Sequence, residues 1–200
     1  MTKPFEIIAA PFTAYWAALS TAFPAIDDAA VTGFTKIGTS GDRNYSDEGV
    51  TVVHEQSIEP VRVLGSTGPV KVLRTEEGLI IRFTLFDLLL EQYKLALNQN
   101  TVATTAAGSG TAGFKEIDLY QDLDVNQIAL LLRGQVSPEG AGWNTQYEVP
   151  AAYQSASPEP VFVKGAPAGL GLEFTAIEDP NAASAAKRFG RLVVQHQTAL

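Results

Sequence analysis

The hydrophobic and polar pattern is most informative in two long extended segments near the middle of the chain. Alternation predicts strands over 50–64 and 71–84, and the glycine- and proline-containing run at 65–69 favours a turn between them. At about 3.3 Å per residue, the first strand would extend about 50 Å, whereas typical strands have five or six residues. The sequence therefore predicts an unusually long hairpin.

The two strands of this hairpin differ in how much of them can be buried. The second alternates cleanly, and Arg74, Glu76 and Arg82 lie opposite its apolar face, whereas the first is polar on both faces around 54–57. A strand that continues beyond its own hydrophobic face needs a bulge or a neighbouring subunit to support it. The apolar face consists of Leu79, Ile81, Phe83 and Leu85.

Shorter extended runs, bounded by turn residues, fill most of the remaining chain. Strands are predicted at 5–9, 14–19, 34–37, 114–120, 128–133, 147–150, 161–164, 170–177 and 191–196. Loops are predicted at 38–49, 108–113, 134–142 and 151–160. The expected fold is mainly β, as a β-sandwich or half-barrel in a single domain over 1–200, with 134–160 as a loop elaboration.

Two helices are predicted beside this sheet. The first covers 85–98, with Thr84 as its cap and Asp87 in the first turn. The second, a short C-terminal helix, begins at Asp179 and stops at Gly190. The apolar face of the first helix would consist of Leu85, Leu88, Leu89, Tyr93, Ala96 and Leu97.

Composition and charge restrict the function. The net charge is −8, and the 14 basic residues are scattered, which argues against tight binding to nucleic acid. The absence of cysteine excludes disulfides, thiol catalysis and thiolate metal sites. The sequence also lacks a signal-peptide pattern and a long apolar run, so we expect a protein made in the cytoplasm, outside the membrane.

The sequence offers little that resembles a catalytic or ligand-binding motif. The run GSGTAG at 108–113 matches a dinucleotide fingerprint by letters, but an alternating strand-like segment follows it instead of a helix, which favours a loop. His54 would point away from Glu55 and Glu59 on a strand, which argues against a metal site. Acid pairs such as 76–77 stand without a nucleophile motif. We therefore predict no enzyme activity, no metal and no cofactor.

Four aromatic residues lie outside the best core segments, and their role is open. Phe12, Tyr15 and Trp16 lie near the amino end of the sequence, and Trp143 lies in a glycine-rich run. They either add to the core or anchor an interface, where aromatic residues are enriched.

The order of these features resembles the tail tube proteins of siphophages. The resemblance is carried by "ALSTAFPAIDDA", "GFTKIGTSGD", the long hairpin with the segment that follows it, and "GLGLEFTAIEDPNAASAAKRFGRLVV". It covers most of the chain and is strongest over 34–98. It implies six subunits to a ring, stacked rings, and a continuous β-barrel lining a channel through which DNA passes without specific binding.

The resemblance also implies roles for particular residues. The acidic balance suits a channel that DNA must not adhere to, and stacking would involve loop 38–49 or the loops at 134–160. Lumen-facing candidates are Glu55, Glu59, Glu76 and Glu77, inter-subunit candidates are Val50, Val52, Ser57 and Arg74, and stacking candidates are Asp42, Arg43, Asn44 and Tyr45.

The implied partners are other copies of the chain and the tape measure, tail terminator and distal tail proteins, in a virion tail assembled in the host cytoplasm. Two alternatives remain open on the sequence alone. One is another virion β-protein, such as a tail terminator or a head decoration protein. The other is a small carbohydrate- or ligand-binding β-module.

Overall fold

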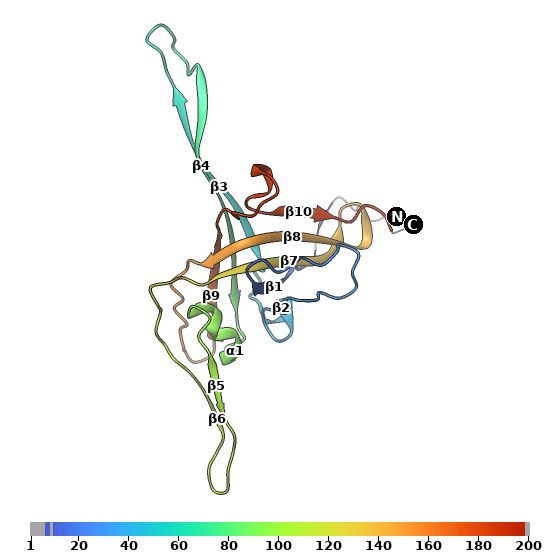
Figure 1. Ribbon diagram of the computed structural model, residues 1–200, viewed down its shortest axis with the longest axis vertical. Helices are drawn as coiled ribbons and strands as arrows, with labels where there is room; N and C mark the ends of the chain where they lie inside the picture. Colours follow the sequence, from blue (N-terminus) through green and yellow to red (C-terminus); the bar gives the residue numbers. More distant parts are fainter. Residues whose placement is uncertain (1–6, 9, 199–200) are drawn as a thin grey trace.

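The computed structural model describes residues 7–8 and 10–198, and it is mainly β (Figure 1). Helical structure is limited to the short helix α1 (Leu90–Tyr93) and the 3-10 turns η1 (Gly41–Asn44), η2 (Lys94–Ala96) and η3 (Ala185–Lys187). The strands are β1 (Thr13–Ala18), β2 (Thr35–Lys36), β3 (Thr51–Val61), β4 (Lys71–Leu85), β5 (Val102–Thr105), β6 (Phe114–Ile117), β7 (Gln127–Ser137), β8 (Gly140–Gln154), β9 (Leu170–Ala176) and β10 (Arg191–Val194).

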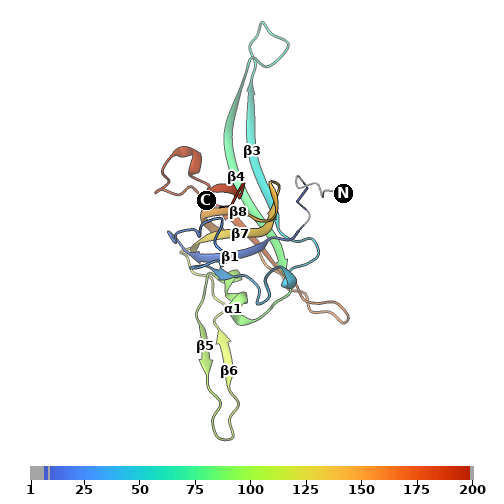
Figure 2. The ribbon, with the colours of Figure 1, turned by 90° about the vertical axis from the view of Figure 1, so that its right-hand side faces the viewer.

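One large antiparallel sheet forms the body, in the order β2-β1-β7-β8-β9-β4-β3. β8 pairs with β10 through residues in its middle, Thr145–Glu148, and with β9 only through its last three residues. β7 and β8 consequently run across the direction of β4 and β9, so the sheet bends strongly (Figures 1 and 2).

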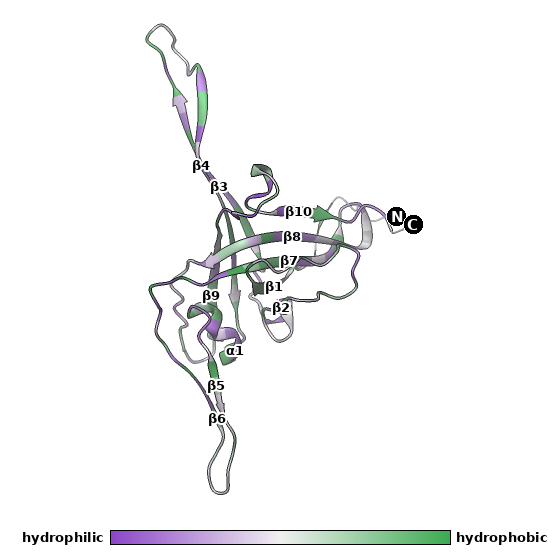
Figure 3. Cartoon of the chain, viewed as in Figure 1, coloured by the Kyte–Doolittle hydropathy of each residue, from purple (hydrophilic) through white to green (hydrophobic). Residues whose placement is uncertain are grey.

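The concave side of this bend holds the main hydrophobic core. β7 contributes alternate residues to it, and the apolar stretches of the crossing strands meet in the body, which Figure 3 shows in green. The apolar face predicted for β4 is confirmed, because all four of its members are buried. The largest fully buried apolar side chains are Phe174, Ile37, Ile81, Leu85, Leu95, Leu130, Leu131, Leu132, Leu170, Leu172 and Val149.

A buried arginine fastens the chain segment 24–28 to the sheet. Arg133 on β7 donates from Nη1 to the carbonyl of Asp28 (2.9 Å) and from Nη2 to the carbonyl of Ala25 (2.6 Å). Its Nε donates to Gln146, whose own amide donates to the carbonyl of Pro24. These bonds satisfy a charged group that is only 8% exposed, which would otherwise be costly to bury.

Two hairpins project from opposite ends of the body (Figures 1 and 2). We call residues 54–78 the arm; it is the part of the β3–β4 hairpin beyond the pairing of β4 with β9, which begins at Ile80. We call residues 102–126 the lower hairpin; it contains β5, β6 and the segment that leads into β7. The unusually long hairpin expected from the sequence is thus confirmed, whereas β5 was not predicted.

Most of the predicted strands are present, but the loop predictions at 134–142 and 151–160 are wrong over much of their length. β7 continues to Ser137 and β8 runs from Gly140 to Gln154, so the expected loop elaboration consists mostly of central strands. The strand predicted at 161–164 is reduced to an isolated bridge between Val163 and Ala166. The strand predicted at 5–9 lies mostly outside the described residues.

The prediction of a long helix over 85–98 is wrong. Leu85 ends β4, where it pairs with Leu170, so the chain is still extended there. The Asp87 carboxylate then accepts hydrogen bonds from the backbone and hydroxyl of Thr39, and one from the backbone of Leu89. Helix begins only at Leu90, and Leu89, predicted to face the core, is 54% exposed.

The predicted C-terminal helix is also wrong. The backbone N–H of Asp179 donates to the carbonyl of Arg188 (2.8 Å), which closes a loop around the single 3-10 turn η3. Gly190 does adopt the left-handed conformation expected of a stop, with φ of 107°. An added Cβ there would lie 1.9 Å from the carbonyl oxygen of Glu148, so β10 and β8 approach closely only because residue 190 is glycine.

A projecting hairpin as candidate interaction site

The arm leaves backbone groups unpaired along both of its edges. β3 is the last strand of the sheet, so its outer edge has no partner among the described residues. β4 pairs with β9 only from Ile80 onward, so the outer edge of β4 is also unpaired within the arm. Exposed strand edges of this kind are templates for pairing with another chain.

A bulge lies midway along the arm. Ser57 pairs with Glu76, but the next residue, Ile58, pairs with Arg74, so Thr75 has no opposite partner. The Ser57 hydroxyl donates to the Glu76 carboxylate (3.0 Å), and the Thr75 hydroxyl donates to the Ser57 carbonyl (3.4 Å). A bulge bends the strand and increases its twist, so the outer half of the arm runs in a different direction from the half next to the body.

The outer half of the arm presents apolar side chains to solvent. Leu64 at the tip is fully exposed, and its neighbours are roughly half exposed. Large exposed apolar side chains gathered in one segment mark an interaction site more often than singly scattered ones do. The residues are Ile58, Val61, Val63, Leu64, Val70, Val72 and Leu73.

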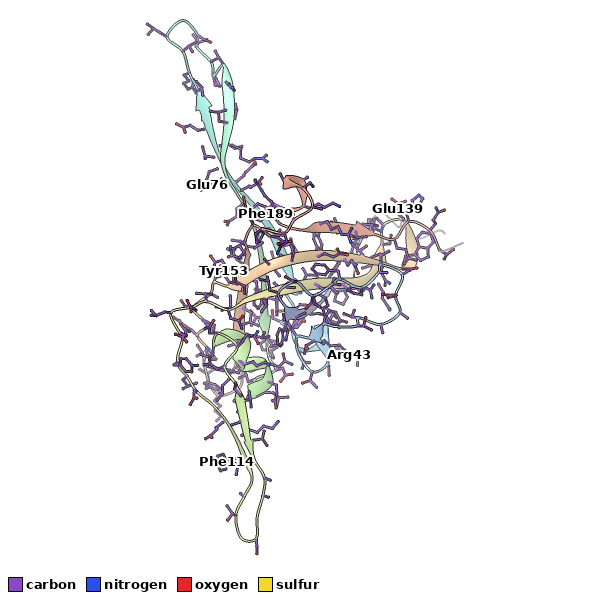
Figure 4. The ribbon with its side chains drawn as sticks, in the orientation of Figure 1. Arg43, Glu76, Phe114, Glu139, Tyr153 and Phe189 are labelled. Carbon is purple, nitrogen blue, oxygen red and sulfur yellow. The ribbon has the colours of Figure 1, made fainter. Side chains whose placement is uncertain are left out.

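The strand register separates the four carboxylates predicted to face a channel. Residues directly opposite in an antiparallel pair share a face, so Glu76 joins Glu55 and Glu59 through its pairing with Ser57. Figure 4 labels Glu76 on the arm. Glu77 pairs with Gln56 and lies on the other face. The Glu77 carboxylate accepts from Arg188, which lowers its pKa below the usual range.

The four residues predicted to join subunits fall into two groups. Val50 and Val52 are partly buried and pack against the core of their own subunit. Ser57 and Arg74 are exposed on the arm, where Arg74 lies 3.6 Å from Glu77. Only these latter two lie where a neighbouring chain has access.

The loop predicted to stack one ring on the next is largely fastened to its own body. Tyr45 is 7% exposed; its hydroxyl donates to the Ile37 carbonyl (2.8 Å) and accepts from the Ala14 backbone (3.1 Å). Asp42 accepts from the Thr13 hydroxyl and Asn44 from the Ser40 backbone. Arg43, labelled in Figure 4, is the one of the four candidates that is exposed. Tyr45 is therefore held within its own chain, and a stacking role for this loop stays a prediction.

No protein-family model matches the sequence, and no curated protein matches it. The arm and its surroundings are therefore the features of this chain that bear on its function.

A cavity of about 480 Å³ lies at the root of the arm, between β3–β4 and β8–β10. His54, Tyr147 and Phe189 contribute to its wall. Two further lining carboxylates are already paired, Glu77 with Arg188 and Glu148 with Arg191. Among the residues that the structure describes, no group of three metal-ligating side chains is found and no helix could span a membrane.

The lower hairpin is a second exposed surface, which the sequence interpretation missed. The segment 118–126 alternates apolar and acidic residues without forming a strand, and Leu123 is 98% exposed. A signal was available, because the run DLYQDLDV at 118–125 has too many large apolar residues for a solvated loop. The tip at Val161–Val163 is also apolar and exposed.

Of the four aromatic residues left open by the sequence, two belong to the main core. Phe12 and Trp16 pack against it, and the Lys94 ammonium lies 4.9 Å from the centre of the Trp16 ring. Tyr15 packs on the other side of the sheet, in the smaller cluster around Leu131. Trp143 covers Gly140 in the turn between β7 and β8.

Proposed function

We propose that this chain is a structural subunit of a tail tube of a long-tailed bacteriophage, in which rings of six copies stack around a channel for DNA. The arm is the observation that supports this function. It is a long hairpin with two unpaired edges and exposed apolar side chains, joined to a body that has its own core. Such a hairpin is built for contact with other chains and contributes little to the core of its own.

The stability of isolated hairpins favours the same reading. A two-stranded ribbon in water is marginally stable at best, and three or more strands are needed for independent stability. The arm has two strands and lacks a buried face over its outer half. Strand pairing between copies would satisfy its edges, and closure of the sheet into a ring would remove edges altogether.

The charge of the arm is consistent with a channel wall. Glu55, Glu59 and Glu76 are exposed and share one face. If that face lines the channel, repetition around the ring makes a band of carboxylates, which repels phosphates within about 8 Å at physiological salt. The tape measure, terminator and distal tail proteins would then be its partners at the inside and the two ends of the tube.

Negative-stain microscopy of the concentrated protein tests this function. Hollow tubes support it, isolated rings support the tail terminator alternative, and a monomer at every concentration overturns it. A variant with Val63, Leu64 and Val70 replaced by serine should remain folded and lose assembly, because these side chains are exposed. Serine at Val161, Phe162 and Val163, an equally exposed apolar tip, provides the matched control.

The cavity at the arm root favours one other function, that of a small ligand-binding module. Its volume of about 480 Å³ lies in the range of ligand pockets. Calorimetry with a panel of monosaccharides and disaccharides, together with light scattering, separates the two functions. Saturable binding by a monomeric protein would favour the module, whereas concentration-dependent assembly without binding favours the tube.

A further inference from the structure

The arm and the lower hairpin carry opposite charge on apolar surfaces. We call residues 58–74, beyond the bulge, the outer arm; it has three basic residues, Arg62, Lys71 and Arg74, against one acid, Glu59. Arg74 is engaged with Glu77, whereas Arg62 and Lys71 have no carboxylate within 4.0 Å among the described residues. The outer arm is therefore basic in a protein whose net charge is −8.

The segment 114–126 of the lower hairpin has the complementary character. Its single basic residue, Lys115, is already paired with Glu91. Its exposed acids are Glu116, Asp118, Asp122 and Asp124, and its exposed apolar side chains are Phe114, Leu119, Tyr120, Leu123 and Val125.

Two asparagines hold this acidic segment in place. The Asn100 side chain donates to the carbonyls of Asp118 (2.7 Å) and Tyr120 (2.8 Å). The Asn98 side chain donates to the carbonyl of Asp124 (2.8 Å) and accepts from the backbone of Asn126 (2.6 Å). Because these bonds are made by the backbone of the segment, its conformation is fixed while its carboxylates stay exposed to solvent. A preorganised surface loses less entropy on binding than a mobile loop.

The outer arm lies at one end of the molecule's long axis, whereas segment 114–126 runs from the lower hairpin, at the other end, up to the start of β7 (Figures 1 and 2). Phe114, labelled in Figure 4, lies at the lower end, far from Glu76 on the arm. The large sheet joins the two ends, so they cannot meet within one chain. On two different chains they can meet head to tail.

We propose that the outer arm of one copy binds along segment 114–126 of the next copy in the axial direction. This contact rests on the proposed tube function and assigns the stacking contact to two surfaces other than loop 38–49. A head-to-tail contact uses different patches on the two partners, so it leaves each new copy with a free end and propagates without limit. The apolar side chains supply the affinity, and the charges set direction and register.

The charge pattern also disfavours axial stacking in which two copies meet arm tip to arm tip. Two outer arms meeting in this way would bring Arg62 and Lys71 of one copy against the same residues of another, and like charges across an interface are unfavourable. Two lower hairpins would likewise oppose their acids. Only the head-to-tail arrangement joins a basic apolar surface to an acidic apolar one.

A charge-swap series tests the contact. Arg62→Glu/Lys71→Glu should raise the concentration needed for tube assembly roughly tenfold, because two exposed attractive pairs become repulsive. Asp122→Lys/Asp124→Lys should have a similar effect. The fourfold variant, which exchanges the signs on both surfaces, should assemble within about twofold of wild type. Sedimentation across protein concentrations, with negative stain of the pellets, measures each.

The control is Lys164→Glu/Lys187→Glu, which makes the same change in net charge at two other exposed positions. It should assemble as wild type does, and an effect equal to that of the arm variant would overturn the specific contact. Failure of the fourfold variant to regain assembly would also overturn it. Normal tubes from the arm variant remove this contact but leave the tube function standing, whereas a wild-type chain that never assembles removes both.

Discussion

Replacing Tyr45 by phenylalanine removes one oxygen atom that holds three parts of the fold together. The hydroxyl donates to the Ile37 carbonyl at 2.8 Å and accepts from the Ala14 backbone at 3.1 Å, in the buried core. The phenyl ring remains, so its packing against Phe83, with ring centres 5.0 Å apart, is kept. Each of the two backbone groups that lose their partner costs about 1–3 kcal/mol, so we expect a loss of about 2–6 kcal/mol in the free energy of unfolding.

Urea denaturation followed by circular dichroism measures this loss, with Tyr120→Phe as the control. Tyr120 is 58% exposed, so its variant should change stability by no more than about 0.5 kcal/mol. A loss below about 0.5 kcal/mol for Tyr45→Phe would refute the reasoning. It would mean that the two backbone groups find other partners.

The same variant should change how stability depends on pH. Burial raises the pKa of Tyr45 well above its ordinary value of 10.0. A phenol whose pKa is higher in the folded state stabilises the fold fully below the unfolded value, and that stability is lost as pH rises beyond it. Wild type should therefore lose stability above about pH 10, more steeply than Tyr45→Phe.

Two further variants examine the fold and the channel. Gly190→Ala should lower the free energy of unfolding by at least about 2 kcal/mol in urea denaturation, because a residue with left-handed backbone would also carry a Cβ against Glu148. Gly142→Ala, where nothing lies within 4 Å of the added Cβ, should lower it by only about 1 kcal/mol, and equal losses would contradict the role of the Glu148 contact. Glu55→Lys/Glu59→Lys should leave tube length unchanged but make the tubes retain DNA in a low-salt pelleting assay; tubes that retain none at any salt concentration would place both residues outside the channel.

The sequence predicts the sheet well where alternation is local and less well where pairing is distant. β4 was predicted because Leu79, Ile81 and Phe83 repeat every second residue. Its last residue, Leu85, is instead predicted to begin a helix, because the apolar spacing over 85–97 fits a period of 3.6. What decides between the two is β9, some 85 residues later in the chain, to which Leu85 pairs through Leu170.

Glycine-rich stretches misled in the opposite direction. The run around Gly134 was assigned to a loop, but Gly134 is buried in β7 at a register shift, and an added Cβ would lie 3.4 Å from the Phe12 ring. Glycine within a strand often marks such a bulge or a close approach. The sequence around Gly134 predicts neither the bulge nor the close approach, because both depend on residues elsewhere in the chain, such as Phe12.

The candidate site could be predicted only in part. The surplus length of the hairpin is a local property, and it identified the arm. Alternation along the strand places Glu76 and Glu77 on opposite faces, but only the register shows that Glu76 is the one that shares a face with Glu55 and Glu59. The burial of Tyr45 depends on hydrogen bonds to segments elsewhere in the chain.

The hydrogen bonds from Arg133 to segment 24–28 affect which substitutions this sequence can accept. In that segment the guanidinium donates only to backbone carbonyl oxygens, and every amino acid supplies the same carbonyl. Saturation mutagenesis should therefore find Ala25 and Ile26 permissive, while Arg133 and Gln146, whose side chains supply the donors, reject nearly all replacements. The backbone at residues 25 and 26 is thus held firmly in place, while the identity of their side chains is constrained very little.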